Sequence, residues 1–375
     1  MYYDIIIVGG GLAGLTSAIH LSKKGLSVLL IEKNEYPKHK VCGEYISNEV
    51  LPYLKALDFN PFDYGAKNIV DFTLSTPRSR SISAKLPTGG FSISRYRIDW
   101  ELSKKAKQYG AQILHIKVTD IQFKNDQFQV FTSKEKQYTS AFVIGSFGKR
   151  SNLDVKMKRD FTQKDAPFLG VKAHYKGAFP EDAVGLHNFV GGYCGMSKVE
   201  TNLVNVCYIA DFKSFKQYKN IGDFQKKVLS QNKYLKDVFD TYELAFEKPL
   251  AISQVSFLEK EPVENHILMC GDSAGMIHPL AGNGMSMAIR AAQMASDQIL
   301  KFKSGEINSR TDLENEYTKI WNKEFSVRLK SGHMIARVFR LGLFSELIML
   351  FLKTFPFILP YIIKRTHGKI MRAEL

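Results

Sequence analysis

The chain has 375 residues, of which 45% are hydrophobic and 24% are charged, and this composition excludes an intrinsically disordered protein. Because a single compact core rarely grows beyond about 250 residues, the length favours two lobes. The 52 Lys and Arg residues exceed the 37 Asp and Glu residues by 15, which predicts an anionic partner such as nucleic acid, a membrane surface or a phosphorylated ligand.

The four cysteines lie far apart, and no two of them form a Cys-x-x-Cys pair. This spacing disfavours a disulfide framework and a structural zinc site, so we expect no metal and a reducing, cytoplasmic environment. We also expect no signal peptide, because the first apolar run, residues 5–8, is short and follows no basic segment.

The first predicted strand is the β-branched run at residues 4–8, and the segment 9–14 that follows it reads Gly-Gly-Gly-Leu-Ala-Gly, which fits G-x-G-x-x-G. An amphipathic helix is predicted over 12–24, and a second strand over 26–31 leads to Glu32. Strand, glycine turn, helix, strand and acid in this order predict a dinucleotide-binding site.

Each residue type has a physical role in this unit. Gly9 permits a tight turn, Gly11 lets the backbone approach a pyrophosphate, and Gly14 lets the helix pack close to the strand. The helix N-terminus offers free N–H groups to the phosphates, and Glu32 is placed to accept hydrogen bonds from an adenosine ribose. The predicted contacts of the dinucleotide here are Gly9, Gly11, Leu12, Ala13, Gly14, Glu32 and Lys33.

The middle of the chain changes to alternating polar and apolar residues. The segments 72–76, 91–94, 171–175 and 204–208 all show this period of two, which is typical of strands with one buried face. We expect them to form an antiparallel sheet that roofs the cofactor and supplies a substrate cavity.

A second glycine-rich element lies far downstream. The apolar run 265–270 leads into Gly-Asp-Ser-Ala-Gly at 271–275, and Pro279 and the Gly-Asn-Gly-Met of 282–285 precede a predicted helix over 286–300. This order resembles the second FAD motif, the GD motif, of the flavoprotein superfamily that contains p-hydroxybenzoate hydroxylase and geranylgeranyl reductase.

The resemblance implies FAD as cofactor and gives these residues roles. Asp272 would hydrogen-bond the ribityl chain, and Pro279 would lie against the edge of the isoalloxazine ring. His278, inside the motif, is a candidate for proton transfer, with a structural role as the alternative. The flavin carbonyls and the pyrophosphate would meet the backbone N–H groups of Gly282, Asn283, Gly284 and Met285.

Three further segments match the same superfamily. Residues 37–44 resemble its P-x-x-x-x-C-G segment, which implies that Cys42 and Gly43 pass near the flavin, with packing as a small buried hydrophobic residue as the alternative for Cys42. Arg95 opens an R-x-x-I-D sequence whose Arg would reach the cofactor, with a surface Arg as the alternative. Val118 falls where a strand backbone would meet the adenine.

The chain also departs from the superfamily in ways that bear on the reaction. Gly148 belongs to a stretch that matches D-G-x-x-S-x-x-R, but Phe147 and Asp154 replace its Asp and Arg, and there is no second full G-x-G-x-x-G. We therefore expect NAD(P)H to bind only transiently as reductant. Residues 192–198 lack the Trp, Phe and Pro of the G-Y-x-W-x-F-P-K segment of isoprenoid reductases, and the W-x-W-x-I-P of halogenases is absent.

Together these patterns predict an α/β protein (α+β overall), a Rossmann-like FAD-binding domain with an inserted antiparallel-sheet substrate domain and a helical C-terminus. The predicted FAD-binding domain is discontinuous and comprises residues 1–70, 95–155 and 265–330. The substrate domain comprises residues 71–94 and 156–264. The apolar, basic helical C-terminal segment comprises residues 331–375.

The C-terminal segment 341–363 contains fourteen Leu, Ile and Phe residues. Glu346, Lys353 and two prolines oppose a spanning helix, so we expect a helix that closes the substrate cavity, lies on a bilayer or simply packs on the core. Residues 328–375 hold nine Lys or Arg against two Glu, a net charge of 9 − 2 = +7. This charge favours peripheral contact with an anionic membrane, at its inner face, over nucleic acid.

Three hypotheses of function remain open at this point. The first is a flavin monooxygenase that hydroxylates an aromatic or polyketide-like apolar molecule, the second a reductase of isoprenoid carbon–carbon double bonds, and the third a flavin-binding protein without catalysis. By position alone, His187 and Tyr193 are candidate substrate residues, with packing inside the strands as the alternative.

Overall fold

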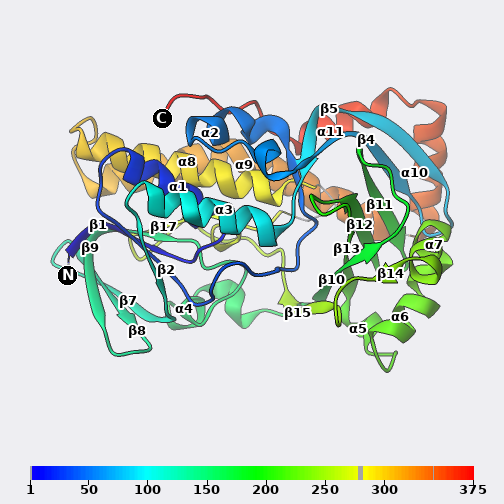
Figure 1. Cartoon of the computed structure of the whole chain (residues 1–375), viewed down its shortest axis with the longest axis horizontal. Helices are drawn as coiled ribbons and strands as arrows, with labels where there is room; N and C mark the ends of the chain where they lie inside the picture. The colour runs from blue at the N-terminus through cyan, green and yellow to red at the C-terminus, as the bar shows by residue number, and fades with distance from the viewer. Residues whose placement is uncertain (1, 278–281, 341) are drawn as a thin grey trace.

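The computed structural model describes residues 2–277, 282–340 and 342–375, which build two sheets flanked by helices (Figure 1). The eight-stranded sheet has the order β16-β17-β9-β1-β2-β6, with the β7–β8 hairpin attached through β9. Its strands are β1 (Tyr2–Val8), β2 (Val28–Glu32), β6 (Gln112–His115), β7 (Val118–Lys124), β8 (Gln127–Thr132), β9 (Gln137–Gly145), β16 (Val263–Glu264) and β17 (Ile267–Met269).

The centre of this sheet is parallel, since β1 runs parallel to both β2 and β9. The run Ile5–Ile7 is fully buried, as expected of a strand covered on both faces. The helices stacked over the sheet in Figure 1 are α1 (Leu12–Lys23), α3 (Arg95–Gln108), α8 (Gly284–Lys303) and α9 (Arg310–Arg340). The predicted Rossmann-like unit is thereby confirmed.

The nine-stranded sheet has the order β14-β10-β13-β12-β11-β4-β5-β3, with β15 paired to β10. All of its pairs are antiparallel except β11 with β4, so the predicted antiparallel roof contains one parallel pair. Its strands are β3 (Tyr45–Ser47), β4 (Lys67–Ser75), β5 (Ser81–Ser92), β10 (Phe168–Lys176), β11 (Ala183–Phe189), β12 (Gly192–Lys198), β13 (Val204–Asp211), β14 (Glu243–Leu244) and β15 (Leu250–Val255). It therefore takes in residues 45–47 and 67–70, which we assigned to the FAD-binding domain.

The two faces of the nine-stranded sheet carry different side chains. On the outer face, Leu169, Val171 and Ala173 of β10 pack in a core cluster with residues of the short helices. The alternating Lys172 and His174 lie on the opposite, inner face. The short helices are α2 (Leu51–Ala56), α4 (Asn152–Lys156), α5 (Phe212–Phe215), α6 (Ile221–Lys227) and α7 (Lys233–Thr241), of which α6 and α7 cover the outer face.

The chain ends in helices α10 (Gly342–Thr354) and α11 (Ile358–Thr366), which confirms the predicted helical C-terminus. Met349, Leu352, Leu359 and Ile363 on these two helices pack against the inner face of β4, β5 and β11. Within the described ranges, no single helix is long and apolar enough to cross a membrane, but the segments of α10 and α11 meet that test as a pair bent by 119°.

Candidate cofactor and active site

The turn between β1 and α1 needs glycine at two positions. Gly9 has a φ of +106°, and a Cβ there would lie 2.3 Å from the backbone oxygen of Ser146. A Cβ at Gly14 would lie 2.0 Å from the backbone oxygen of Gly9, so the helix approaches the strand as closely as predicted. The first turn of α1 therefore lies directly against the end of β1.

The N-terminus of α1 is open to an anion. The helix begins at Leu12 after Gly11, no side chain caps it, and its first turn holds no acidic residue. The free N–H groups and the helix dipole favour a phosphate at this point. Leu12 and Ala13 are buried, whereas Lys33 is exposed.

Glu32 lies at the end of β2, where the parallel pairing with β1 brings its carboxylate to the glycine turn. One carboxylate oxygen accepts a hydrogen bond of 2.8 Å from the Gly10 N–H, and the other accepts from the N–H and the side-chain amide of Asn34. The predicted ribose acceptor is therefore buried and held in place beside the turn.

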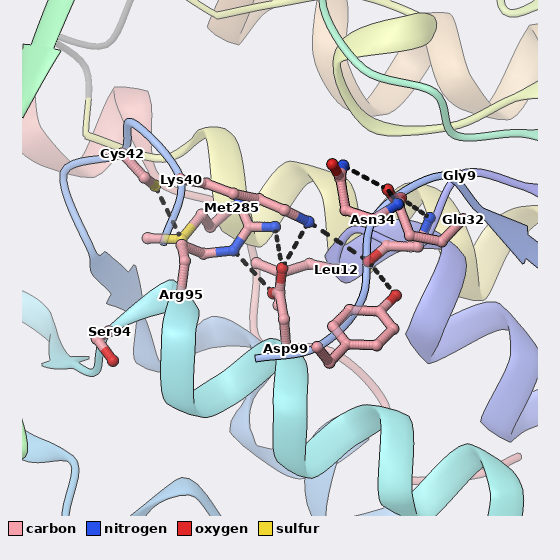
Figure 2. A network of polar contacts seen from close by, with 12 residues as sticks. Gly9, Leu12, Glu32, Asn34, Lys40, Cys42, Ser94, Arg95, Asp99 and Met285 are labelled. Atoms are coloured by element: carbon pink, nitrogen blue, oxygen red, sulfur yellow. Dashed lines mark hydrogen bonds and ion pairs between the residues drawn. The ribbon is translucent and has the colours of Figure 1, made fainter. Parts of the chain in front are cut away.

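A charged cluster lies next to the same turn, as Figure 2 shows. Arg95, the first residue of α3, donates two hydrogen bonds of 2.8 Å to the Asp99 carboxylate, and Lys40 donates a third. Burial alone would raise the pKa of Asp99, but Arg95 and Lys40 outweigh it and lower that pKa. Two cations against one carboxylate leave a net positive charge, which suits a pyrophosphate.

The GD segment converges on this cluster from the far end of the sequence. Asp272 lies in a 3₁₀ turn at Gly271–Ser273, and Ser273 Oγ accepts a hydrogen bond of 2.9 Å from the Gly148 N–H. Burial raises the pKa of Asp272 against the opposing charges of Lys260 and Arg95. No described residue donates a hydrogen bond to the Asp272 carboxylate, so its oxygens are available to ribityl hydroxyl groups.

The start of α8 meets the Cys42 segment. Cys42 Sγ lies 3.4 Å from Met285 Sδ (Figure 2), and a Cβ at Gly282 would be 3.9 Å from the Tyr45 ring. Asn283 is fully buried and donates hydrogen bonds to Glu49 and to the carbonyl of Thr366, so its side chain ties α8 to the C-terminus. Gly284 is the first residue of α8.

The remaining predicted contacts are Val118, Gly43, His278 and Pro279. Val118 is buried at the start of β7. A Cβ at Gly43 would meet no atom within 4 Å, so the backbone there has open space. His278 and Pro279 lie outside the residues that the structure describes. The described residues thus offer free helix amides, a net positive charge and carboxylates for hydroxyl groups, and this set fits FAD.

Comparisons with known proteins agree with this chemistry. Residues 4–41 match the family model of FAD-dependent oxidoreductases. A digeranylgeranylglycerophospholipid reductase from Methanothermobacter thermautotrophicus is 23% identical over 88% of this chain and 86% of its own. A solved geranylgeranyl bacteriochlorophyll reductase-like protein from Thermoplasma acidophilum superposes with a TM-score of 0.72 at 17% identity, over 91% of this chain and 88% of that one.

The chain therefore resembles the FAD-dependent oxidoreductases of the geranylgeranyl reductase superfamily. A flavin-dependent brominase also shares the fold, with a TM-score of 0.78 at 16% identity over 97% of this chain and 94% of that one. The family match covers the first glycine turn and the relative covers most of the chain, so the FAD prediction is confirmed at the level of the cofactor.

The inner face of the nine-stranded sheet is the second half of the candidate site. Register places Lys172 opposite Cys207, Cys207 opposite Gly195, and Gly195 opposite Leu186. The row continues through Leu74 of β4, which lies under α10 and α11. It therefore runs from a charged end to an apolar end. We call it the inner row.

The charged end of the inner row is a buried cluster around Glu44. The Glu44 carboxylate accepts hydrogen bonds from Lys172, from the backbone N–H of Arg95 at 2.7 Å and, at 2.8 Å, pairs with His174 Nε2. Burial would raise the pKa of Glu44, but Lys172 and His174 outweigh it and lower that pKa. Glu44 thus joins the sheet to the first residue of α3.

Cys42 lies two residues before this cluster and is tied to the same face. Its carbonyl accepts a hydrogen bond of 3.2 Å from Asn205 on β13. Burial raises the pKa of the Cys42 thiol despite the nearby Arg95, so the sulfur keeps its proton at neutral pH. The side chains of His39, Glu44 and His174 lie close enough together to hold a metal ion. However, the Lys172 ammonium already pairs with the Glu44 carboxylate, and its positive charge would repel a metal cation there.

The two candidate substrate residues lie on opposite faces. Tyr193 pairs with Asn188 and lies on the inner face, two residues from Gly195 of the inner row. His187 lies on the outer face, where its Nδ1 is 2.9 Å from Ser75 Oγ and its ring stacks on Tyr234 of α7. This placement favours the alternative role of His187, packing inside the strands.

The departure at residues 147–154 also has a structural explanation. Asp154, in place of the motif's Arg, is buried, completes a capping box with Ser151 and forms an ion pair of 2.9 Å with Arg159. Arg150, the nearest cation in that stretch, donates to the carbonyl of Thr162. The segment therefore stabilises a local turn.

Sequence reasoning missed several residues of the site, and some of them had a signal. Asp99 stands four residues after Arg95, a spacing that pairs side chains on one helix face. Lys172 and His174 share one face of a strand that is otherwise apolar. Lys40 and Glu44 lie in the predicted segment 37–44, but their ion-pair partners could not be foreseen because these come from distant parts of the chain.

Proposed function

We propose that this flavoenzyme reduces a carbon–carbon double bond in an apolar, lipid-like substrate. The inner row carries the proposal, because it leads from the apolar surface under α10 and α11 to groups that hold protons beside the cofactor motifs. The named activity of the archaeal relative supports the same choice. Sequence alone had ranked hydroxylation first.

The two ends of the inner row have different tasks in this reaction. Bound FAD in its reduced form supplies a hydride, and the second carbon of the alkene then needs a proton. Lys172 Nζ and the neutral thiol of Cys42 hold protons at the charged end. The apolar end binds the substrate chain and excludes water. Together this hydride and a proton from one of these two residues would saturate the double bond, with both electrons drawn from the reduced cofactor.

The test compares anaerobic and aerobic turnover. The FAD-loaded enzyme is reduced with dithionite or with NADPH, the transient reductant that the sequence predicts, and is mixed with digeranylgeranylglycerophospholipid without O₂. We expect the absorbance of oxidised flavin to return and the lipid to gain one H₂ per reduced bond. A flavin that stays reduced until O₂ is admitted, with an oxygen atom in the product, would establish hydroxylation instead. A rate of flavin reoxidation that is the same with and without the lipid would indicate flavin binding without catalysis.

A further inference from the structure

Helices α10 and α11 are apolar on two sides. Their inner side chains, among them Met349 and Leu359, are buried against the nine-stranded sheet. An amphipathic surface helix would turn a polar face outward, but here large apolar residues face solvent. These outer residues are Leu347, Leu350, Phe351, Phe355, Phe357 and Tyr361, with exposures from 41% to 73%.

The outward residues gather at the bend between the helices. The two helices change direction by 119° around residues 355–357, Phe-Pro-Phe, all of which are exposed. The Phe355 ring lies 5.1 Å from that of Phe351 and 6.2 Å from that of Phe357. We call this cluster of Phe351, Phe355 and Phe357 the aromatic tip.

The charges around the aromatic tip have one sign on the outside. Lys353, Lys364 and Arg365 are exposed on the two helices. Glu346 is the only acidic residue between 342 and 366. It is buried, lies 3.6 Å from Arg80 and accepts a hydrogen bond from the Arg78 N–H. The outer surface therefore combines exposed aromatic rings with a positive rim.

We propose that the aromatic tip inserts into the interface of an anionic membrane, with Lys353, Lys364 and Arg365 at the lipid headgroups. Exposed aromatic and aliphatic side chains beside cations are the chemistry of a protein that lies on a bilayer without crossing it. A second copy of this chain fits less well, because two such rims would bring like charges together. The docking does not depend on the reaction proposed above.

The experiment measures binding of the FAD-loaded protein to unilamellar vesicles by flotation. One set is phosphatidylcholine alone, and the other adds phosphatidylglycerol. The wild type should float with the anionic set and lose that binding in high salt. The variant F355S/F357S should bind at least about tenfold more weakly. The variant K353Q/K364Q should lose the preference for anionic vesicles.

The matched control is V155S/V190S, which removes two exposed apolar side chains, of 55% and 63% exposure, that lie outside α10 and α11 and should bind as wild type. Unchanged binding by F355S/F357S, or no binding by the wild type, would overturn the docking. A change of F355S/F357S from dimer to monomer without vesicle binding would also overturn it, in favour of an interface between copies. Flavin absorbance of each variant reports separately on the cofactor, so a failure of the proposed reaction is distinguishable.

Discussion

The two sheets contribute different kinds of groups to the candidate site: the eight-stranded sheet offers mainly backbone groups, and the nine-stranded sheet offers side chains. The eight-stranded sheet offers the expected cofactor mainly backbone, with free amides at α1 and a glycine turn whose residues are adjacent in sequence. The nine-stranded sheet presents side chains, and Lys172 and His174 of β10 hold the Glu44 carboxylate, which lies just before β3. Backbone recognition leaves a local motif in the sequence, whereas side-chain recognition across strands does not.

The largest expected effect tests the side-chain half. Lys172→Met removes the cation from a fully buried ion pair and leaves the Glu44 carboxylate with only His174 and the Arg95 N–H, which should cost about 3–5 kcal/mol of unfolding free energy. Chemical denaturation measures the loss, and single-turnover reduction should fall with it. The double variant K172M/E44Q removes both charges of this pair and should recover most of the stability. Equal stability of K172M and wild type would mean that the buried Lys172–Glu44 ion pair does not hold the side-chain half of the site together.

The next effect tests the backbone half. Gly14→Ala places a Cβ 2.0 Å from the Gly9 backbone oxygen, which cannot move freely, so we expect a loss of about 2–3 kcal/mol and weaker FAD retention. Gly195→Ala is the matched control, because its Cβ would sit at an ordinary 3.6 Å and should cost less than about 1 kcal/mol. Equal losses in the two variants would contradict the close approach of α1 to β1.

A smaller effect compares one buried histidine from each half. Burial lowers the pKa of His187 and of His20 to about 4. The pKa of histidine in an unfolded chain is about 6.5, so on acidification the unfolded chain binds the proton before the folded chain does. Stability should therefore fall as the pH drops from about 6.5 to about 4, by up to about 3 kcal/mol for each histidine.

Denaturation at several pH values, with His187→Gln and His20→Gln, checks this slope. Each variant should flatten it by a similar amount, since both side chains are buried and neutral. A raised KM in H187Q, with the pH slope of the variant unchanged from wild type, would contradict a purely buried and neutral His187. That result would restore its predicted role in the substrate site.

The difference between local backbone motifs and distant side-chain pairs also explains which features could be predicted from the sequence. The turn at Gly9–Gly14, the acid at Glu32 and the order of elements around Asp272 were readable, because each depends on neighbours in the chain. The choice between His187 and Tyr193 was not, because a period of two does not say which face of a strand turns inward. The Lys172–Glu44 pair was out of reach for another reason: it joins residues 128 positions apart.

The exposed face of α10 and α11 could be predicted from the sequence only in part. The sequence showed an apolar, basic segment and left three placements open. The structure shows one side packed on the sheet and the other in solvent, which a count of apolar residues does not distinguish.

FAD binding by the purified apoprotein tests the central claim most directly. Titration followed by flavin fluorescence should show one FAD per chain for the wild type. Asp272→Ala should bind at least about tenfold more weakly, because we expect the Asp272 carboxylate to accept hydrogen bonds from the ribityl chain. A wild type that binds no flavin, or an Asp272→Ala variant with unchanged affinity, would contradict the account.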